Sequence, residues 1–224
     1  MPTSDYNNIS AVLSVIASVQ PASVLDVGCG FGKYGVLLRE YLDIWNERLT
    51  PDTWHTRLVG VEAFEDYRNP ISDYVYNELH FGPAQQVLPA LGRFDLVLIS
   101  DVIEHLEIQD ATRLVEHCLN AGSIVLISTP RDFYRQHDIC GNPYEVHRCH
   151  WKAQHFPNGA YVSVVHLLSC NLFVASLSPL PDGICYLADY RNVLYIQSRY
   201  RLRRLRALGL PISYLLRQLA RLFA

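Results

Sequence analysis

Residues 23–32 read SVLDVGCGFG, a short apolar run that ends in a glycine-rich turn. From Lys33 to Ile44, large apolar side chains recur mostly at helical spacing, and a second apolar run, RLVGVEA, follows at residues 57–63. Glycines between a strand and a helix permit positive φ angles and let a ligand come close to the backbone. The stretch therefore predicts a strand, a turn suited to close approach by a ligand, a helix and a second strand.

Two further apolar runs extend this pattern. FDLVLIS at residues 94–100 and GSIVLIS at residues 122–128 are continuous, as is typical of parallel strands buried on both faces. The segment between them has helical periodicity, and alternating strands and helices predict a doubly wound α/β sheet. After a loop-like segment over residues 130–157, we expect late strands within residues 160–168, 171–178 and 192–198.

The chain of 224 residues is 50% hydrophobic and fits one domain, which we place at residues 1–198, followed by a tail at residues 199–224. The tail holds seven arginines and no acid, and its leucines fall at near-helical spacing interrupted by Gly209 and Pro211. It predicts a basic, amphipathic pair of short helices. These would cover the sheet, form a dimer contact or dock on an anionic membrane.

Charge and cysteine usage narrow the class of protein. The first 198 residues carry 12 basic and 22 acidic side chains, which argues against a broad nucleic-acid-binding surface. The six cysteines contain no C-x-x-C pair, and no apolar run of membrane-spanning length occurs in the sequence. The stretch MPTSDYNNIS has neither the basic nor the apolar region of a signal peptide, so we expect no processing. We expect a soluble, cytoplasmic protein with reduced thiols, membrane-peripheral if the tail docks. The sequence does not set its oligomeric state.

Two acids accompany the glycine turn. Glu62 ends the second strand, where a carboxylate can accept hydrogen bonds from both hydroxyls of a ribose, and Asp26 precedes the turn. A dinucleotide-binding turn, G-x-G-x-x-G, would have its third glycine at position 33, but Lys33 stands there. The pattern therefore favours a cofactor that lacks a pyrophosphate.

Three motifs, VLDVGCGFG, VGVEA and FDLVLISDVIEHL, occur in this order within residues 22–130 and together resemble class I S-adenosylmethionine-dependent methyltransferases. The resemblance implies a Rossmann-like, mostly parallel seven-stranded sheet with helices on both faces, and S-adenosylmethionine as cofactor. Pro83 stands where relatives often carry an adenine-binding acid, which leaves adenine to backbone atoms or Gln85. The resemblance implies cofactor contacts by Asp26, Gly28, Cys29, Gly30, Gly32, Glu62, Ala63, Phe64, Ser100 and Asp101.

A cluster of acids and histidines follows the strand at residues 94–100. If a helix begins there, Asp101 shares a face with Glu104 and His105, although these acids would also suit a helix cap and the helix dipole. The long segment after residue 130 resembles an active-site lid and contains His147. Carboxyl ends of neighbouring parallel strands share one edge of a sheet, so we expect the residues after the strand at 94–100 and those of the lid to meet in one pocket. The expected catalytic residues are Asp101, Glu104, His105 and His147, and the expected lid contacts are Tyr144, Glu145, His150 and Trp151.

The role of the cluster stays open between a base and a metal site. Some O-methyltransferases of quinone biosynthesis and of small-RNA capping use an acid-x-x-Glu-His string and a later histidine to hold a divalent cation. The resemblance of residues 101–105 and His147 to this pattern implies a metal site, which is the less favoured of the two roles here. His105 or His147 otherwise suits a general base. We expect methyl transfer to a hydroxyl of a small-molecule, glycan (sugar) or lipid-linked acceptor. The alternatives are an aminopropyl-type transferase and a non-catalytic cofactor-binding module.

Overall fold

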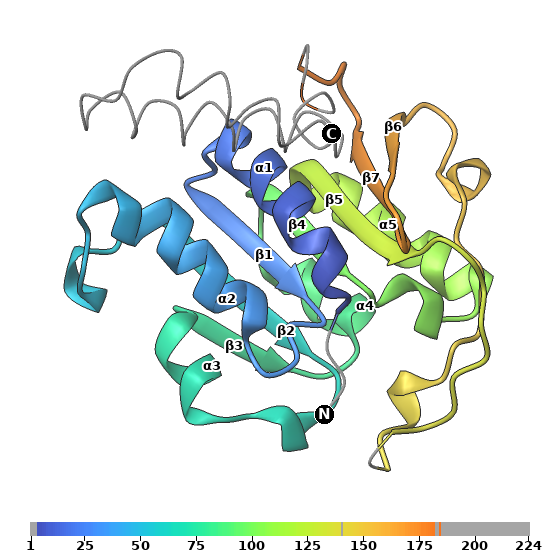
Figure 1. Ribbon diagram of the computed structural model, residues 1–224, viewed down its shortest axis with the longest axis horizontal. Coiled ribbons are helices and arrows are strands. Elements are labelled where there is room, and N and C mark those ends of the chain that lie inside the picture. The colour runs from blue at the N-terminus through green and yellow to red at the C-terminus, as the bar shows by residue number, and fades with distance from the viewer. Residues whose placement is uncertain (1–3, 140, 182–183, 185–224) are drawn as a thin grey trace, which may run out of the picture.

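The computed structural model describes residues 4–139, 141–181 and 184. Its strands form one sheet in the order β3-β2-β1-β4-β5-β7-β6 (Figure 1). Neighbours among β1 to β5 pair in parallel, whereas β7 pairs antiparallel with both β5 and β6. The predicted mostly parallel, seven-stranded sheet is confirmed. The strands are β1 Ser23–Val27, β2 Arg57–Glu62, β3 Glu78–Phe81, β4 Phe94–Ser100, β5 Gly122–Pro130, β6 Tyr161–His166 and β7 Cys170–Ser176.

Helices cover both faces of the sheet (Figure 1). The α-helices are α1 Ile9–Val19, α2 Lys33–Leu38, α3 Pro70–Val75, α4 Ala84–Val87 and α5 Ile108–Ala121. A π-helical turn, η2 Arg39–Asp43, prolongs α2, which confirms the helical interpretation of this segment. Short 3-10 turns are η1 Tyr6–Asn8, η3 Ile44–Asn46, η4 Pro51–Thr53, η5 Glu65–Tyr67, η6 Leu88–Ala90, η7 Ile103–His105, η8 Pro143–Glu145 and η9 Ala153–His155.

The core consists of two apolar layers separated by the sheet. Val24 in β1 belongs to the layer that contains residues of α1 and α2, and the next residue, Leu25, belongs to the layer that contains residues of α5. Successive side chains of a strand point to opposite faces, so a strand covered on both sides is apolar throughout. This is why the apolar runs locate the central strands, and their carboxyl ends form the edge that bears the site.

The helix expected to begin at Asp101 does not form there. Asp101 has a left-handed backbone with φ of 53°, and its N–H donates to the Ser128 carbonyl at 2.9 Å, which continues the association of β4 with β5. A left-handed residue cannot belong to a right-handed helix. The chain instead makes the 3-10 turn η7, and α5 begins at Ile108. Asp101, Glu104 and His105 therefore do not share an α-helical face.

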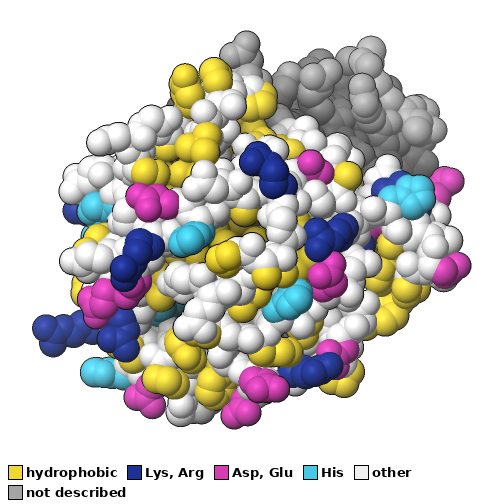
Figure 2. Space-filling model, turned by 180° about the vertical axis from the view of Figure 1, so that it is seen from behind, with side chains coloured by type: hydrophobic (Ala, Val, Ile, Leu, Met, Phe, Trp, Pro, Cys, Tyr) yellow, Lys and Arg dark blue, Asp and Glu magenta, His cyan; other side chains and the backbone are white. Residues whose placement is uncertain are grey.

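Some predictions fall outside the described residues: the strand within residues 192–198, the tail at 199–224 and the boundary between tail and domain. In the described part of the chain, no helix is long and apolar enough to cross a membrane. On the face shown in Figure 2, basic and acidic side chains of the described residues are interspersed.

Candidate active site

A cavity of about 240 Å³ opens at the carboxyl edge of the strands, beside the glycine turn. Gly28 has φ of 73°, and a Cβ atom there would lie 2.2 Å from Val102 Cγ2, so only glycine fits. Gly30 has φ of 53°, but a Cβ atom there would meet nothing within 4 Å. The turn thus leaves the backbone open to the cavity at Gly30.

Glu62, at the end of β2, lies against this turn. Its Oε2 accepts a hydrogen bond from the Gly30 N–H and its Oε1 accepts one from the Phe64 N–H, each at 2.9 Å. Burial raises the pKa of Glu62, while these backbone donors act in the opposite direction. A carboxylate oxygen can accept more than one hydrogen bond, so the carboxylate retains acceptor capacity toward the cavity.

Asp26, for which the sequence predicts a contact with the cofactor, lies next to the glycine turn but outside the cavity lining. Its side chain is 2% exposed and accepts a hydrogen bond of 2.6 Å from the Tyr76 hydroxyl, and it does not line the cavity. Burial raises the pKa of Asp26 to about 7 despite the Tyr76 hydrogen bond. Asp26 therefore contacts the hydroxyl of Tyr76, the residue that directly follows α3.

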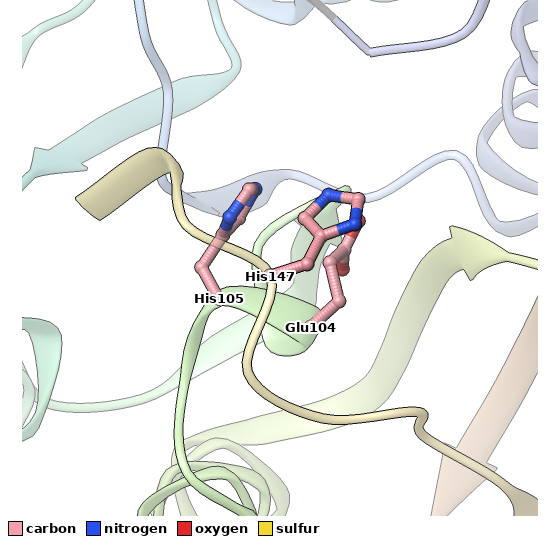
Figure 3. Close-up of side chains that lie close together, drawn as sticks. All are labelled: Glu104, His105 and His147. Atoms are coloured by element: carbon pink, nitrogen blue, oxygen red, sulfur yellow. The ribbon is translucent and has the colours of Figure 1, made fainter. Parts of the chain in front are cut away.

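The acid and histidine cluster does converge. One possible ligand atom from each of Glu104, His105 and His147 lies within 4.8 Å of the other two, and the two imidazole centroids are 4.9 Å apart. Figure 3 shows the three side chains together, Glu104 and His105 from η7 and His147 from the loop that follows β5. The expected meeting of these residues is confirmed, although η7 rather than an α-helix positions the first two.

Hydrogen bonds define the chemical state of this cluster. The His147 Nδ1 atom lies 3.0 Å from the Tyr134 carbonyl oxygen, which can only accept, so Nδ1 carries the proton and Nε2 keeps its lone pair. Glu104 is 3% exposed, and Thr129 Oγ1 donates to its Oε2 at 3.1 Å. No hydrogen-bond partner for the buried Nδ1 atom of His105 is found among the described residues.

Burial also shifts the pKa values of these groups. It raises the pKa of Glu104 well above its usual range, and the nearby Asp101 carboxylate adds to the shift. Burial, together with His147, lowers the pKa of His105 to about 4. Burial likewise lowers the pKa of His147. The cluster thus combines a buried acid with two imidazoles that favour the neutral form.

The N-terminal segment closes one side of the cavity, which no sequence motif indicates. The Asp5 N–H donates to Asp101 Oδ2 at 3.0 Å, and Asn8 Nδ2 donates to the same oxygen at 3.3 Å and to Ser128 Oγ at 3.1 Å. Tyr34 donates its hydroxyl to Asn8 Oδ1 at 2.8 Å. Asp101 therefore anchors residues 5–8 over the ends of β4 and β5.

The predicted lid residues divide into two groups. Tyr144 and Glu145 line the cavity, and Glu145 Oε1 accepts a hydrogen bond of 3.0 Å from the Tyr67 hydroxyl. His150 instead lies 3.0 Å from the Arg131 carbonyl oxygen and does not line the cavity. Trp151 is 0% exposed and packs in the core, so its assignment to the lid is wrong. A large apolar ring gains more from this burial than from exposure at a loop.

The cavity brings together most of the predicted site residues. Those that line it are Gly28, Cys29, Gly30, Glu62, Ala63, Ser100, Asp101, Glu104, His105, Tyr144, Glu145 and His147. Gly32, like Asp26, lies outside the lining, as does Phe64, whose ring packs against Tyr67 with centroids 5.0 Å apart. Lining residues that the sequence did not single out for this site include Ser4, Asp5, Lys33, Tyr67, Tyr134, Gln136 and Asn142. Pro83 and Gln85 also line it.

Fold and site together define a Rossmann-like α/β protein with a ligand cavity at the carboxyl edge of its sheet. The chain belongs to the methyltransferase-domain family, whose model matches residues 6–165. The family resemblance of the three sequence motifs is thereby confirmed. A search of curated protein sequences finds no match.

Solved structures with the same fold are distant in sequence. The N-terminal domain of EvdMO1, studied with SAH and D-fucose, is 15% identical, with a TM-score of 0.55 over 79% of this chain and 85% of that one. A SAM-dependent methyltransferase from Archaeoglobus fulgidus is 15% identical, with a TM-score of 0.52 over 75% and 92%. Magnesium protoporphyrin IX methyltransferase from Synechocystis, with bound SAM, is 15% identical, with a TM-score of 0.50 over 76% of each chain. At this identity the likeness establishes the fold.

Proposed function

We propose that this protein transfers a methyl group from S-adenosylmethionine to a hydroxyl group of a small-molecule, glycan or lipid-linked acceptor. The observation that carries the proposal is that one cavity joins Glu62 and the glycine turn to Glu104, His105 and His147. The first set suits a nucleoside cofactor, and the second suits an acceptor whose proton must be removed. Neither set alone would distinguish a methyltransferase from a cofactor-binding module.

The residues of the cavity fit this cofactor. Glu62 has acceptor capacity for a ribose diol, and the bare backbone at Gly30 leaves room for close approach. Next to Glu62 lie Ala63 and Tyr67, and beyond β3 lie Pro83 and Gln85, which we assign to the adenine. The cofactor supplies the transferable methyl group on a sulfonium sulfur. The chain supplies alignment, which can contribute roughly 7–11 kcal/mol to a bimolecular reaction.

His147 is our candidate for the base. Its Nε2 lone pair is available because Nδ1 is committed to the Tyr134 carbonyl oxygen, and this hydrogen bond also fixes the ring. The acceptor oxygen would bond to the methyl carbon as the bond from that carbon to the sulfonium sulfur breaks, which leaves S-adenosylhomocysteine as a neutral thioether. The hydroxyl proton would pass to His147 Nε2. Tyr134 and Tyr144 are exposed aromatic residues in the cavity lining, and we assign them to the acceptor.

A divalent cation bound by Glu104, His105 and His147 is the second candidate. Two observations favour it: the ligand atoms lie within 4.8 Å of one another, and the buried Nδ1 atom of His105 lacks a described hydrogen-bond partner. One carboxylate and two neutral imidazoles suit Mn²⁺, Fe²⁺ or Zn²⁺. Such an ion would hold the acceptor hydroxyl and favour loss of its proton.

Tritiated S-adenosylmethionine, incubated with panels of catechols, sugars and lipid-linked hydroxyl compounds, tests the proposal. We expect label in at least one hydroxyl acceptor and a loss of about 10²- to 10⁴-fold in turnover for His147→Ala. The matched control is His137→Ala, an exposed histidine of the same loop. Binding of S-adenosylhomocysteine without methylation of any acceptor would instead support a non-catalytic module.

Treatment with a chelator separates the two candidate roles of the cluster. Activity that falls in EDTA and returns with Mn²⁺, Fe²⁺ or Zn²⁺ supports the metal site, and the metal content of the purified protein, measured by mass spectrometry, is an independent check. Activity that persists in EDTA in protein without bound metal supports His147 as the base.

A further inference from the structure

Among the described residues that line the cavity, acidic side chains outnumber basic ones. The described residues that line it include the carboxylates of Asp5, Glu62, Asp101, Glu104 and Glu145 but, among lysines and arginines, only Lys33. The proposed cofactor ends in an amino acid that bears one carboxylate. Placed beside most of this surface, that carboxylate would have no lysine or arginine as a partner, and each ionised acid would repel it. Lys33 is therefore the described lining residue with the charge to bind it.

The strand order places Lys33 at the end of the cavity where the amino-acid part of the cofactor is expected. Neighbouring strands run in the order β3-β2-β1-β4, and Glu62 ends β2. With the adenine assigned to the side of β3, the rest of the cofactor extends across β1 toward β4. Lys33 begins α2 directly after the β1 turn, and its side chain lines the same cavity as Asp101, which follows β4. The amino-acid end of the cofactor would thus lie near Lys33.

The N-terminal segment holds the Lys33 ammonium in place. Its Nζ donates to the Ser4 carbonyl oxygen at 2.7 Å and to Ser4 Oγ at 2.8 Å, and the side chain is half-buried. An ammonium has three N–H donors. A bound carboxylate would accept the third N–H or replace the Ser4 hydroxyl. Partial burial strengthens such a charged hydrogen bond relative to one in water.

We propose that Lys33, held by Ser4, binds the carboxylate of the methionyl part of the cofactor and so selects S-adenosylmethionine over its decarboxylated form. This inference rests on the proposed function, because it takes the cofactor from there. It also gives a physical reason against the aminopropyl-type transferase, whose cofactor lacks the carboxylate. Lys33 would act as a binding and specificity residue with no part in proton transfer.

Calorimetric titration of the full chain with S-adenosylmethionine and decarboxylated S-adenosylmethionine tests this inference, since the two ligands differ by the carboxylate. For the wild type we expect the intact cofactor to bind about tenfold or more tightly than the decarboxylated one. Lys33→Met should bring the ratio of the two affinities close to one. Lys152→Met, at the other lysine of the chain and exposed, should keep the wild-type ratio.

A third ligand controls for damage to the fold. Binding of 5′-methylthioadenosine, which lacks the whole amino-acid part, should be nearly unchanged in Lys33→Met. An unchanged ratio in this variant would overturn the inference, as would equal weakening of all three ligands, which would make Lys33 structural. If the wild type binds none of them, the proposed function itself fails, and the two failures are distinguishable.

Discussion

Replacement of Glu62 by Ala should weaken cofactor binding and leave the fold in place. The Glu62 carboxylate now accepts two backbone hydrogen bonds of 2.9 Å, from Gly30 and Phe64, and we propose that it also accepts from the ribose hydroxyls. A hydrogen bond to a charged group contributes about 1.5–3 kcal/mol. Loss of one such contribution corresponds to an affinity for S-adenosylhomocysteine that is about 10- to 150-fold lower.

Isothermal titration calorimetry with S-adenosylhomocysteine measures this effect, and circular dichroism of Glu62→Ala checks that the protein is folded. Glu65→Ala is the matched control, because Glu65 is an exposed acid three residues further along the same connection. It should bind like the wild type. An affinity unchanged in Glu62→Ala would place the ribose elsewhere, and tight binding of NAD by the wild type would contradict the cofactor assignment.

Three further predictions concern other parts of the chain. Burial raises the pKa of Asp26 from 3.8 to about 7, so between these pH values the folded state keeps a proton that the unfolded state releases, and stability falls as pH rises. Asp26→Asn should therefore add up to about 4 kcal/mol to the unfolding free energy at pH 8 and little at pH 4. Urea unfolding that shows no such difference would count against this prediction. Gly28→Ala should lower the unfolding free energy by about 1–3 kcal/mol more than Gly92→Ala. Both glycines have positive φ, but only at Gly28 would the added Cβ lie 2.2 Å from a neighbouring side chain, that of Val102. Equal losses of stability in chemical denaturation would contradict the steric argument. The arginine-rich tail should bind phosphatidylserine vesicles in a salt-sensitive manner, and equal sedimentation of the full chain and of a chain ending at Ser198 would assign it another role.

The sheet was largely predictable because its central strands are buried on both faces. A continuous apolar run such as residues 94–100 can be located without tertiary information, and the glycines after β1 show where the chain turns. The convergence of His105 with His147 was likewise predictable, because carboxyl ends of neighbouring strands share an edge. Topology therefore carried the site prediction across some 40 residues of sequence.

The predictions that failed depended on contacts distant in sequence. The bond from the Asp101 N–H to the Ser128 carbonyl accompanies a left-handed backbone that no local pattern indicates. Trp151 was expected in the lid from its neighbours in sequence, but it packs in the core. The hydrogen bond between Asp26 and Tyr76, which are 50 residues apart, was likewise not indicated by the sequence. Local spacing gives no information on such pairings.

A crystal structure with S-adenosylhomocysteine would show whether one cavity joins cofactor binding to the acid and histidine cluster. We expect ribose hydroxyls within hydrogen-bond distance of the Glu62 carboxylate and a sulfur atom that faces His105 and His147 across the cavity. Adenine should lie toward Pro83. A ligand whose sulfur faces away from the two histidines, or a ribose without contact to Glu62, would show that the cavity does not join the two groups of residues in this way.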